Sequence, residues 1–470
     1  MRICHVTSAD PDQGVTGVAA YVRDLAHALA GAGHEVGHVY RTPGPAVAGV
    51  SSVRWTVRRG CRYAAVSAND AGDGSPASRF EGDVRGGPAL NAWLAAVEGI
   101  HPDVVHVHDL SGVPADIIPA CCARAYPVIV TLHDFWAFCR RLLLVRQDLT
   151  PCDGPDGGRN CARYCAGEPR PTRRMLTRLL IQTGPLSRPL RMARRAYRRV
   201  RGARASQFVV RRGTGSAGAT GDAITAYASR QALMRDALLA ATCLLAPSED
   251  TRAQYERQGY PRGRIRVLPL SLLFEGRARG PRGFRGYPVR FGYMGRVNAW
   301  KGAHVLAEAA AEIPADRAHV TFYGAVEPED ERYLTVLAGG GGRVSFSGRY
   351  TRAQLAEIVE EIDVAVFPSI MRETQGLVGL EAQIAGLPVI AAAGGAIPEY
   401  VHHDVNGLLF TPGSASGLRE QLRRVVDEPE MIGRLSANVR PPRRMDWHLA
   451  EILPIYEAAV SGERQAVSSR

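Results

Sequence analysis

Lysine is almost absent from this chain. Of its 58 lysine and arginine residues, one is a lysine, Lys301. If that lysine had fallen at random among the basic positions, any given position would hold it once in 58. It stands in the stretch MGRVNAWKGAH, which also contains Arg296. Chance explains this placement poorly, so we interpret Lys301 as a functional residue.

Long apolar runs are also missing. No uninterrupted apolar run reaches the roughly 18 to 20 residues that span a bilayer, because glycine and proline interrupt the longest candidates. The N-terminal sequence MRICHVTSAD leads directly into a strand-like run, without the basic region and cleavage site of a secretory signal. We therefore expect a cytoplasmic protein.

Acidic residues are absent from residues 170–221, which contain 14 arginines. Without this segment, 44 basic residues stand against 46 acidic ones, so the formal net charge of +12 belongs to one region. An arginine-rich, partly apolar segment fits an anionic surface, such as the inner face of a membrane to which the protein binds peripherally. A solvated insertion without a partner is the alternative. We expect no nucleic-acid binding, because no recognised module accompanies the arginines.

Two series of alternating strands and helices predict the fold. The first opens with a strand, a glycine-containing loop, a helix of period 3.6 and a second strand within residues 1–40. The second opens near residue 288. We read residues 41–88 as a long variable connection without regular structure. The fold class is α/β, with two doubly wound Rossmann-like domains facing across a cleft at the carboxyl ends of their strands.

We place the domain boundaries as follows. The N-terminal domain takes residues 1–270, the linker 271–287 and the C-terminal domain 288–445, with a last helix and tail at 446–470.

Charged residues follow two strands of the second series. Arg296 and Lys301 come directly after a strand, where helix amides and two cations would form a diphosphate site. Glu373 follows the strand DVAVFPS, and Glu381 lies inside the next helix, a position from which a carboxylate can accept hydrogen bonds from sugar hydroxyls. The amides that begin that helix can take phosphate oxygens; they belong to Gly376, Leu377 and Val378.

Four of the nine cysteines cluster within 27 residues around a polar loop rich in glycine, proline and aspartate. Such a loop needs a metal or disulfide staple. A cytoplasmic location favours a structural zinc ion, although the spacing is not that of a standard zinc finger. The four are Cys139, Cys152, Cys161 and Cys165.

Several motifs resemble one known family. The run G-R-x4-K-G, the F-x-G at 346–348, DVAVFPS, and E-x7-E followed by AGLPVIA are similar to the retaining glycosyltransferases of family 4, which have the GT-B fold. DVVHVHD, TLHD and APSE agree more loosely in the first half. A subset of that family has a comparable four-cysteine insertion after an HDFW motif.

The resemblance implies a role for each site residue. Arg296 and Lys301 would hold the diphosphate of a nucleoside-diphosphate sugar, Glu381 the ribose and Glu373 the transferred sugar. His133 would approach that sugar from the N-terminal domain. The loop at Gly17 would bring amides to the diphosphate, and residues near Arg349 would flank the base through the main chain.

The implied reaction is transfer with retention of the anomeric configuration, from a UDP or GDP sugar to a hydroxyl of a carbohydrate, lipid-linked or small-molecule acceptor. Polysaccharide, glycolipid and natural-product biosynthesis are the expected settings. No catalytic metal is expected, because no Asp-x-Asp pair follows a strand of the C-terminal domain and the pair Asp10 and Asp12 lies in a loop that is no metal site in this family. The last helix would cross back onto the N-terminal domain.

Two alternatives remain. The first is another enzyme of the same fold, a nucleotide-sugar epimerase; a pyridoxal-dependent phosphorylase is disfavoured by the E-x7-E pattern and the lack of lysine. The second is a basic nucleic-acid-binding protein. A dinucleotide-binding regulator is disfavoured, because the first glycine loop lacks the full G-x-G-x-x-G pattern and no acidic residue ends the second strand.

Overall fold

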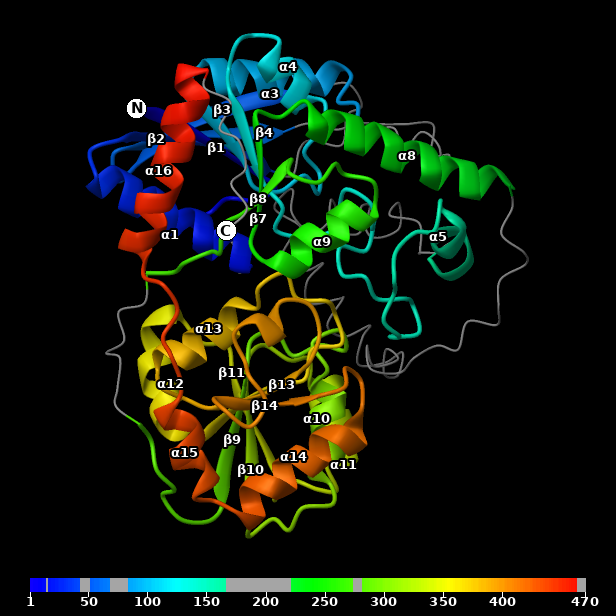
Figure 1. Cartoon of the computed structure of the whole chain (residues 1–470), viewed down its shortest axis with the longest axis vertical. Helices are drawn as coiled ribbons and strands as arrows, with labels where there is room; N and C mark the ends of the chain where they lie inside the picture. Colours follow the sequence, from blue (N-terminus) through cyan, green and yellow to red (C-terminus); the bar gives the residue numbers. More distant parts are fainter. Residues whose placement is uncertain (14–15, 43–50, 68–82, 166–220, 274–280, 463–470) are drawn as a thin grey trace, which may run out of the picture.

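The computed structural model describes residues 1–13, 16–42, 51–67, 83–165, 221–273 and 281–462. Two α/β domains are stacked along the long axis of the molecule (Figure 1). Each contains a twisted sheet of mainly parallel strands, as expected for the GT-B fold. The predicted fold class is therefore confirmed.

The N-terminal domain is built on an eight-stranded sheet. Its strands lie in the order β3 (Ser52–Arg58), β4 (Cys61–Ser67), β2 (Glu35–Thr42), β1 (Arg2–Thr7), β5 (Val104–Val107), β6 (Val128–Thr131), β7 (Cys243–Ala246) and β8 (Ile265–Val267). Chain order reverses between β1 and β5, so ligands are expected at the carboxyl ends of these two strands. The helices are α1 (Gly17–Gly31), α3 (Pro88–Glu98), α4 (Ile117–Cys122), α5 (Arg159–Tyr164), α8 (Gly221–Leu239) and α9 (Glu249–Arg257).

The prediction of an irregular connection at 41–88 was wrong. Strands β3 and β4 form an antiparallel hairpin within it, and β4 extends the parallel sheet next to β2. The turn at Arg59 and Gly60 has positive φ at both residues, as in the tight hairpins that match strand twist. The edge strand β3 is mostly exposed, but Val53, Trp55 and Val57 alternate with polar residues, so the period-2 pattern of a strand was present in the sequence.

The C-terminal domain is built on a six-stranded parallel sheet. Its strands lie in the order β11 (Val344–Gly348), β10 (Ala318–Tyr323), β9 (Val289–Met294), β12 (Val364–Phe367), β13 (Val389–Ala392) and β14 (Gly407–Phe410). The order reverses between β9 and β12. The helices are α10 (Ala303–Ala310), α11 (Pro328–Leu337), α12 (Leu355–Glu361), α13 (Leu377–Ile384), α14 (Ala415–Asp427) and α15 (Met431–Ala437), with short 3-10 turns at η1 (Arg352–Gln354) and η2 (Ile397–Glu399).

The last described helix, α16 (Met445–Ser461), returns to the N-terminal domain, where it lies beside α1 (Figure 1). Its apolar residues Ile452, Ile455 and Tyr456 complete a core that includes Tyr21 and Leu25 of α1. The packing of this helix agrees with the arrangement implied by the family resemblance.

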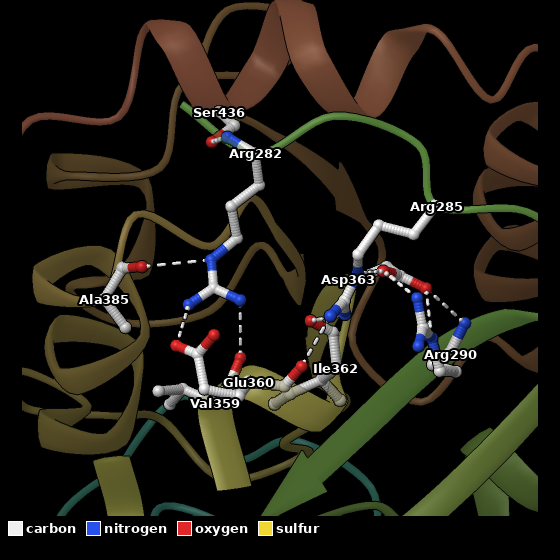
Figure 2. Close-up of polar contacts among 9 residues, drawn as sticks. All are labelled: Arg282, Arg285, Arg290, Val359, Glu360, Ile362, Asp363, Ala385 and Ser436. Carbon is white, nitrogen blue, oxygen red and sulfur yellow. Dashed lines mark hydrogen bonds and ion pairs between the residues drawn. The ribbon is translucent and has the colours of Figure 1, made fainter. Parts of the chain in front are cut away.

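Two arginines fasten the segment before β9 to the C-terminal domain (Figure 2). Arg282 donates to the carbonyls of Val359 and Ala385, near the ends of α12 and α13. Arg285 donates to Asp363, whose carboxylate also accepts two hydrogen bonds from the guanidinium of Arg290. The negative ends of two helices and a buried carboxylate thus meet planar guanidinium groups, a geometry for which arginine suits better than lysine.

The arginine-rich segment 170–221 lies almost entirely outside the described residues. The prediction that it binds an anionic surface therefore stays a prediction. Among the residues described, no helix is both long and apolar enough to cross a membrane.

Candidate functional site

The candidate site lies where the two points of strand-order reversal face each other. Arg296 and Lys301 follow β9, while Glu373 and Gly376 follow β12, so the C-terminal residues predicted from the sequence gather at one switch point. The loop before α1 follows β1 of the other domain. This is the location at which doubly wound domains bind their ligands.

Lys301 pairs with Glu373 at the centre of the site. The Nζ of Lys301 lies 2.6 Å from Oε1 of Glu373, and the hydroxyl of Ser369 donates to the same oxygen at 2.7 Å. Glu373 is buried, whereas the lysine side chain keeps 35% of its exposure. The backbone amide of Lys301 donates to Oδ1 of Asn298, which fixes the loop. The partly exposed lysine side chain thus places its ammonium beside a buried carboxylate, whose charge it neutralises.

Glycines bring the backbone close to this pair. Gly395 has a φ of +64°, and a Cβ there would lie 2.0 Å from the carbonyl oxygen of Glu373. Gly302 has a φ of +70°, and its Cβ would lie 1.7 Å from the carbonyl oxygen of Pro368. Both positions exclude any side chain, because the conformation and the space each require glycine.

The N-terminus of α13 faces the N-terminus of α1, which belongs to the other domain. Gly376 precedes α13 with a φ of +74°, and Leu377 and Val378 begin the helix. A Cβ on Gly17 would lie 3.1 Å from Cδ1 of Leu377, so the two helix starts approach closely. The first amides of a helix have no acceptor within it, and the positive ends of two helix dipoles add to each other here. The arrangement can hold an anion.

His133 reaches the same place from the N-terminal domain. It follows β6, and its backbone carbonyl accepts a hydrogen bond of 2.8 Å from the hydroxyl of Thr374, the residue after Glu373. Its ring is buried, which lowers its pKa to about 3, with the neighbouring His448 adding to the effect. His133 is therefore neutral at physiological pH and can donate or accept a hydrogen bond.

Further contacts hold the domains together around the site. The side-chain amide of Gln375 pairs with both backbone groups of Leu270, with Oε1 accepting from the amide at 2.6 Å and Nε2 donating to the carbonyl at 3.0 Å. Arg372 forms an ion pair with Asp250 on α9. The residues on either side of Glu373 thus bind the facing domain.

Glu381 lies one turn further along α13 and is partly buried. Burial raises its pKa to about 7, while the guanidinium of Arg352 acts in the opposite direction and the carboxylate of Asp24 in the same one. Arg352 of η1 forms an ion pair with Asp24 of α1, in the other domain. The carboxyl group predicted to bind ribose is thus coupled to the contact between the domains.

The structure places the remaining predicted residues at the edges of the site. Arg296 is exposed, and its carbonyl accepts from the hydroxyl of Tyr293 at 2.6 Å. Arg349 is exposed directly after β11. The first Asp-x-Asp pair has a structural partner, since Arg58 of β3 lies 2.8 Å from Asp10 and 3.5 Å from Asp12.

The four clustered cysteines are not joined to one another by disulfides in the described part of the chain. Cys139 and Cys161 are buried, and burial raises the pKa of the Cys161 thiol, with the nearby thiols of Cys165, Cys139 and Cys152 adding to it. Within the described part of the chain, the group of three metal-binding side chains whose ligand atoms lie within 4.8 Å of one another consists of histidines, His5, His106 and His108. The predicted zinc site stays a prediction.

Sequence reasoning missed Ser369, Thr374, Gln375 and the pair of Asp24 with Arg352. Ser369 could have been chosen, because it follows the strand DVAVFP at the carboxyl edge that carries Glu373. The pair joins two domains across 328 positions of sequence, and no local pattern announces it.

Family comparisons cover both domains. Residues 277–441 match the family described as glycosyl transferases group 1, and residues 15–209 match glycosyltransferase family 4. Together the two matches include more than three quarters of the chain.

Curated relatives match over shorter stretches. The D-inositol 3-phosphate glycosyltransferase 1 of Catenulispora acidiphila is 32% identical over 187 residues, which are 37% of this chain and 44% of that protein. The D-inositol 3-phosphate glycosyltransferase of Mycolicibacterium smegmatis is 30% identical over 37% of this chain and 41% of its own length. The chain thus matches less than half the length of these relatives.

Solved structures are similar over nearly the whole chain. Sucrose-phosphate synthase from Thermosynechococcus elongatus has a TM-score of 0.62 at 18% identity and covers 98% of this chain and 100% of its own. Anabaena HepE in complex with UDP has a TM-score of 0.60 at 14% identity and covers 97% and 100%. At these identities the likeness concerns the fold. The C-terminal half of the chain thus matches the glycosyl transferases group 1 model, the N-terminal half matches the glycosyltransferase family 4 model, and the two halves are joined in the GT-B fold.

Proposed function

We propose that this chain is a retaining glycosyltransferase that moves a sugar from a nucleoside-diphosphate sugar to an acceptor hydroxyl. The observation that carries the proposal is the pairing of Lys301 with Glu373 at 2.6 Å, beside the N-terminus of α13 and opposite His133. Support for the donor class comes from the neighbouring HepE structures, which are complexes with UDP and with UDP-glucose.

In this proposal, cations and helix amides bind the diphosphate, while carboxylates and a histidine bind hydroxyl groups. Lys301, Arg296 and the amides at the start of α13 stabilise the diphosphate as it leaves and gains negative charge. Glu373 and His133 bind hydroxyls of the transferred sugar from opposite sides. Glu381 accepts hydrogen bonds from the ribose. The contacts between Gln375 and Leu270 and between Arg372 and Asp250 hold the cleft closed around the donor.

A donor screen tests the proposal. We expect one UDP or GDP sugar to raise the melting temperature of the full chain, and mass spectrometry to detect a glycosylated product with a suitable panel of hydroxyl acceptors. Inositol phosphates belong in that panel, because the curated relatives are named for such an acceptor. Retention is read from the anomeric configuration of the product by NMR.

The outcomes separate this reaction from its alternative. Conversion of one nucleotide sugar into another without any acceptor would indicate an epimerase and contradict the proposal. Failure of every UDP and GDP sugar to bind would contradict it as well. Glu373→Gln serves as the matched variant, because it keeps the size of the side chain while removing the charge that Lys301 neutralises, and it should abolish transfer.

A further inference from the structure

A chain of imidazoles runs from His133 into the sheet of the N-terminal domain. The Nε2 of His133 lies 3.2 Å from Nδ1 of His108, which follows β5. The Nε2 of His108 lies 2.9 Å from Nδ1 of His5, which lies in the middle of β1. Both distances fit hydrogen bonds between ring nitrogens. His133 is therefore the outer end of a three-membered chain.

The protonation state of the rings requires all hydrogen bonds along this chain to point the same way. Burial lowers the pKa of all three imidazoles, so each ring is neutral and has one N–H donor and one bare nitrogen acceptor. His108 uses both nitrogens within the chain, so it must donate to one neighbour and accept from the other. Consequently the protons all point outward, toward His133, or all point inward, toward His5.

The two ends of the chain decide between these directions. His5 is completely buried, and its Nε2 has no hydrogen-bond partner. With protons pointing inward, this nitrogen would carry a buried N–H without an acceptor. With protons pointing outward, it is a bare lone pair, and unpaired acceptors are tolerated in protein interiors more often than unpaired N–H groups. The outward direction also places the N–H at the end of the chain on His133, which has 8% exposure, against 0% for His5 at the other end.

From this geometry we propose that His5 and His108 are positioning residues that hold His133 as the tautomer protonated on Nδ1. In that state His133 offers an N–H donor at the cleft and cannot act as a base there. This inference rests on the proposed function for its catalytic meaning: His133 would donate a hydrogen bond to an oxygen of the donor sugar. The tautomer itself is a property of the folded chain.

A second interpretation concerns two of these rings and a neighbour. In it, His5, His106 and His108 bind a metal ion. The contacts of His106 speak against it, because its Nδ1 lies 2.7 Å from the hydroxyl of Tyr456 and its Nε2 2.7 Å from that of Thr131. Both nitrogens of His106 thus have partners. The three rings are also fully buried or nearly so, and a divalent ion among neutral groups in a core carries a large desolvation cost.

NMR of the full chain labelled with 15N-histidine tests the proposal, because long-range proton–nitrogen spectra report which ring nitrogen carries hydrogen. We expect His133 to be protonated on Nδ1. In His108→Phe both contacts are lost, so His133 should become a mixture of tautomers and kcat should fall about tenfold, the lower end of the loss seen when the hydrogen-bond partner of a metal-ligating histidine is removed. The KM for the donor should change by no more than about twofold.

Two variants serve as controls. His108→Asn keeps an amide N–H that can replace Nδ1 of the imidazole, so it should retain the tautomer of His133 and most of kcat. His38→Asn changes a ring that stacks on His5 at 5.5 Å but lies outside the chain, and it should alter neither.

Three results would overturn the proposal. They are a wild-type His133 protonated on Nε2, a His108→Phe protein in which the tautomer is unchanged, and a stoichiometric metal ion in the purified protein that is lost in His5→Asn. Since the tautomer is measured without substrate, failure of the proposed transfer reaction would be recognised separately by the donor screen.

Discussion

At the scale of single residues, the lone lysine has a distinct environment. The Nζ of Lys301 contacts Oε1 of the buried Glu373, which also accepts a hydrogen bond from the hydroxyl of Ser369. Because two donors share this oxygen, the space beside it suits a compact ammonium. In Lys301→Arg the larger planar group would displace Glu373, and we expect kcat/KM to fall about 100-fold, as when one preorganised donor to the developing charge is lost. Steady-state kinetics measure this effect.

The matched control for that variant is Arg332→Lys, which exchanges the same two residue types at an exposed position on α11, outside the site, and should lose little activity. Equal activity of Lys301→Arg and the wild type would show that the lysine is not required at this place.

Gly395 supports the same carboxylate through the backbone. In Gly395→Ala the new Cβ would collide with the carbonyl of Glu373, and the φ of +64° would be strained as well. Gly413→Ala is the control, because Gly413 has a φ of +80° and nothing within 4 Å of its Cβ. The control should cost about 1 to 2 kcal/mol of unfolding free energy from the conformation alone. Denaturant titrations should show a clearly larger loss for Gly395→Ala, and equal losses would refute the steric argument.

At the scale of elements, the segment between β12 and α13 closes the cleft. Gln375→Leu would leave the amide and carbonyl of Leu270 buried without partners in the closed form, at about 1 to 3 kcal/mol each. In the open form these groups reach water. We therefore expect a larger radius of gyration in small-angle scattering and a donor KM raised about tenfold or more, because a smaller fraction of molecules is closed.

A graded control strengthens this test. Gln375→Glu keeps the acceptor for the amide of Leu270 but loses the donor for its carbonyl, so it should fall between the wild type and the leucine variant. A leucine variant that stays as compact as the wild type would contradict the assignment of this contact to closure.

The loop around α5 gives a prediction about metal content. If the four clustered cysteines hold a structural zinc ion, elemental analysis of the purified protein should find about one zinc per chain, and Cys161→Ser should lose it together with thermal stability. Cys243→Ser is the control, because Cys243 lies on β7, outside the cluster, and its replacement should leave the zinc content unchanged. Absence of zinc from a protein with nine titratable thiols would disprove the prediction.

At the scale of the whole molecule, buried imidazoles make stability depend on pH. Burial lowers the pKa of six histidines below the ordinary value, five in the N-terminal domain and one on α16, to about 4 for His38 and His448: the six are His5, His38, His106, His108, His133 and His448. The unfolded chain takes up protons near pH 6.5 and the folded one does not. Their contribution is therefore complete above pH 6.5 and is lost as the pH falls toward 4.

Within that window, each of these histidines lowers the free energy of unfolding by up to about 1.4 kcal/mol for every unit by which the pH falls. Asp134 and Glu381, whose pKa burial raises to about 7, act in the opposite direction and offset part of the loss. Unfolding titrations at pH 7 and 5.5 should show a marked fall in stability. His38→Asn should reduce the difference, whereas replacing the exposed His402 should not; an equal difference in both variants would contradict this account.

Much of the architecture could be predicted from the sequence, because buried parallel strands and their glycine loops have strong local patterns. Lys301, Glu373 and Gly376 follow such strands, and the structure brings them together as expected. The hairpin at 52–67 was missed because the connection around it is rich in glycine, alanine and serine, and this composition outweighed the alternation of Val53, Trp55 and Val57 with polar residues. The histidine chain was also missed, since each ring lies in or after a different strand and only the register of the sheet aligns them.

The position of α16 has a consequence for how the chain is made. Tyr456 contacts His106, and His448 contacts the hydroxyl of Tyr21, so the core of the first domain includes side chains that the ribosome adds after the whole second domain. Domains usually fold as soon as they emerge during synthesis. We therefore expect the face of the N-terminal sheet that α16 covers to stay open until the end of the chain has been synthesised, by which time the second domain can already have folded.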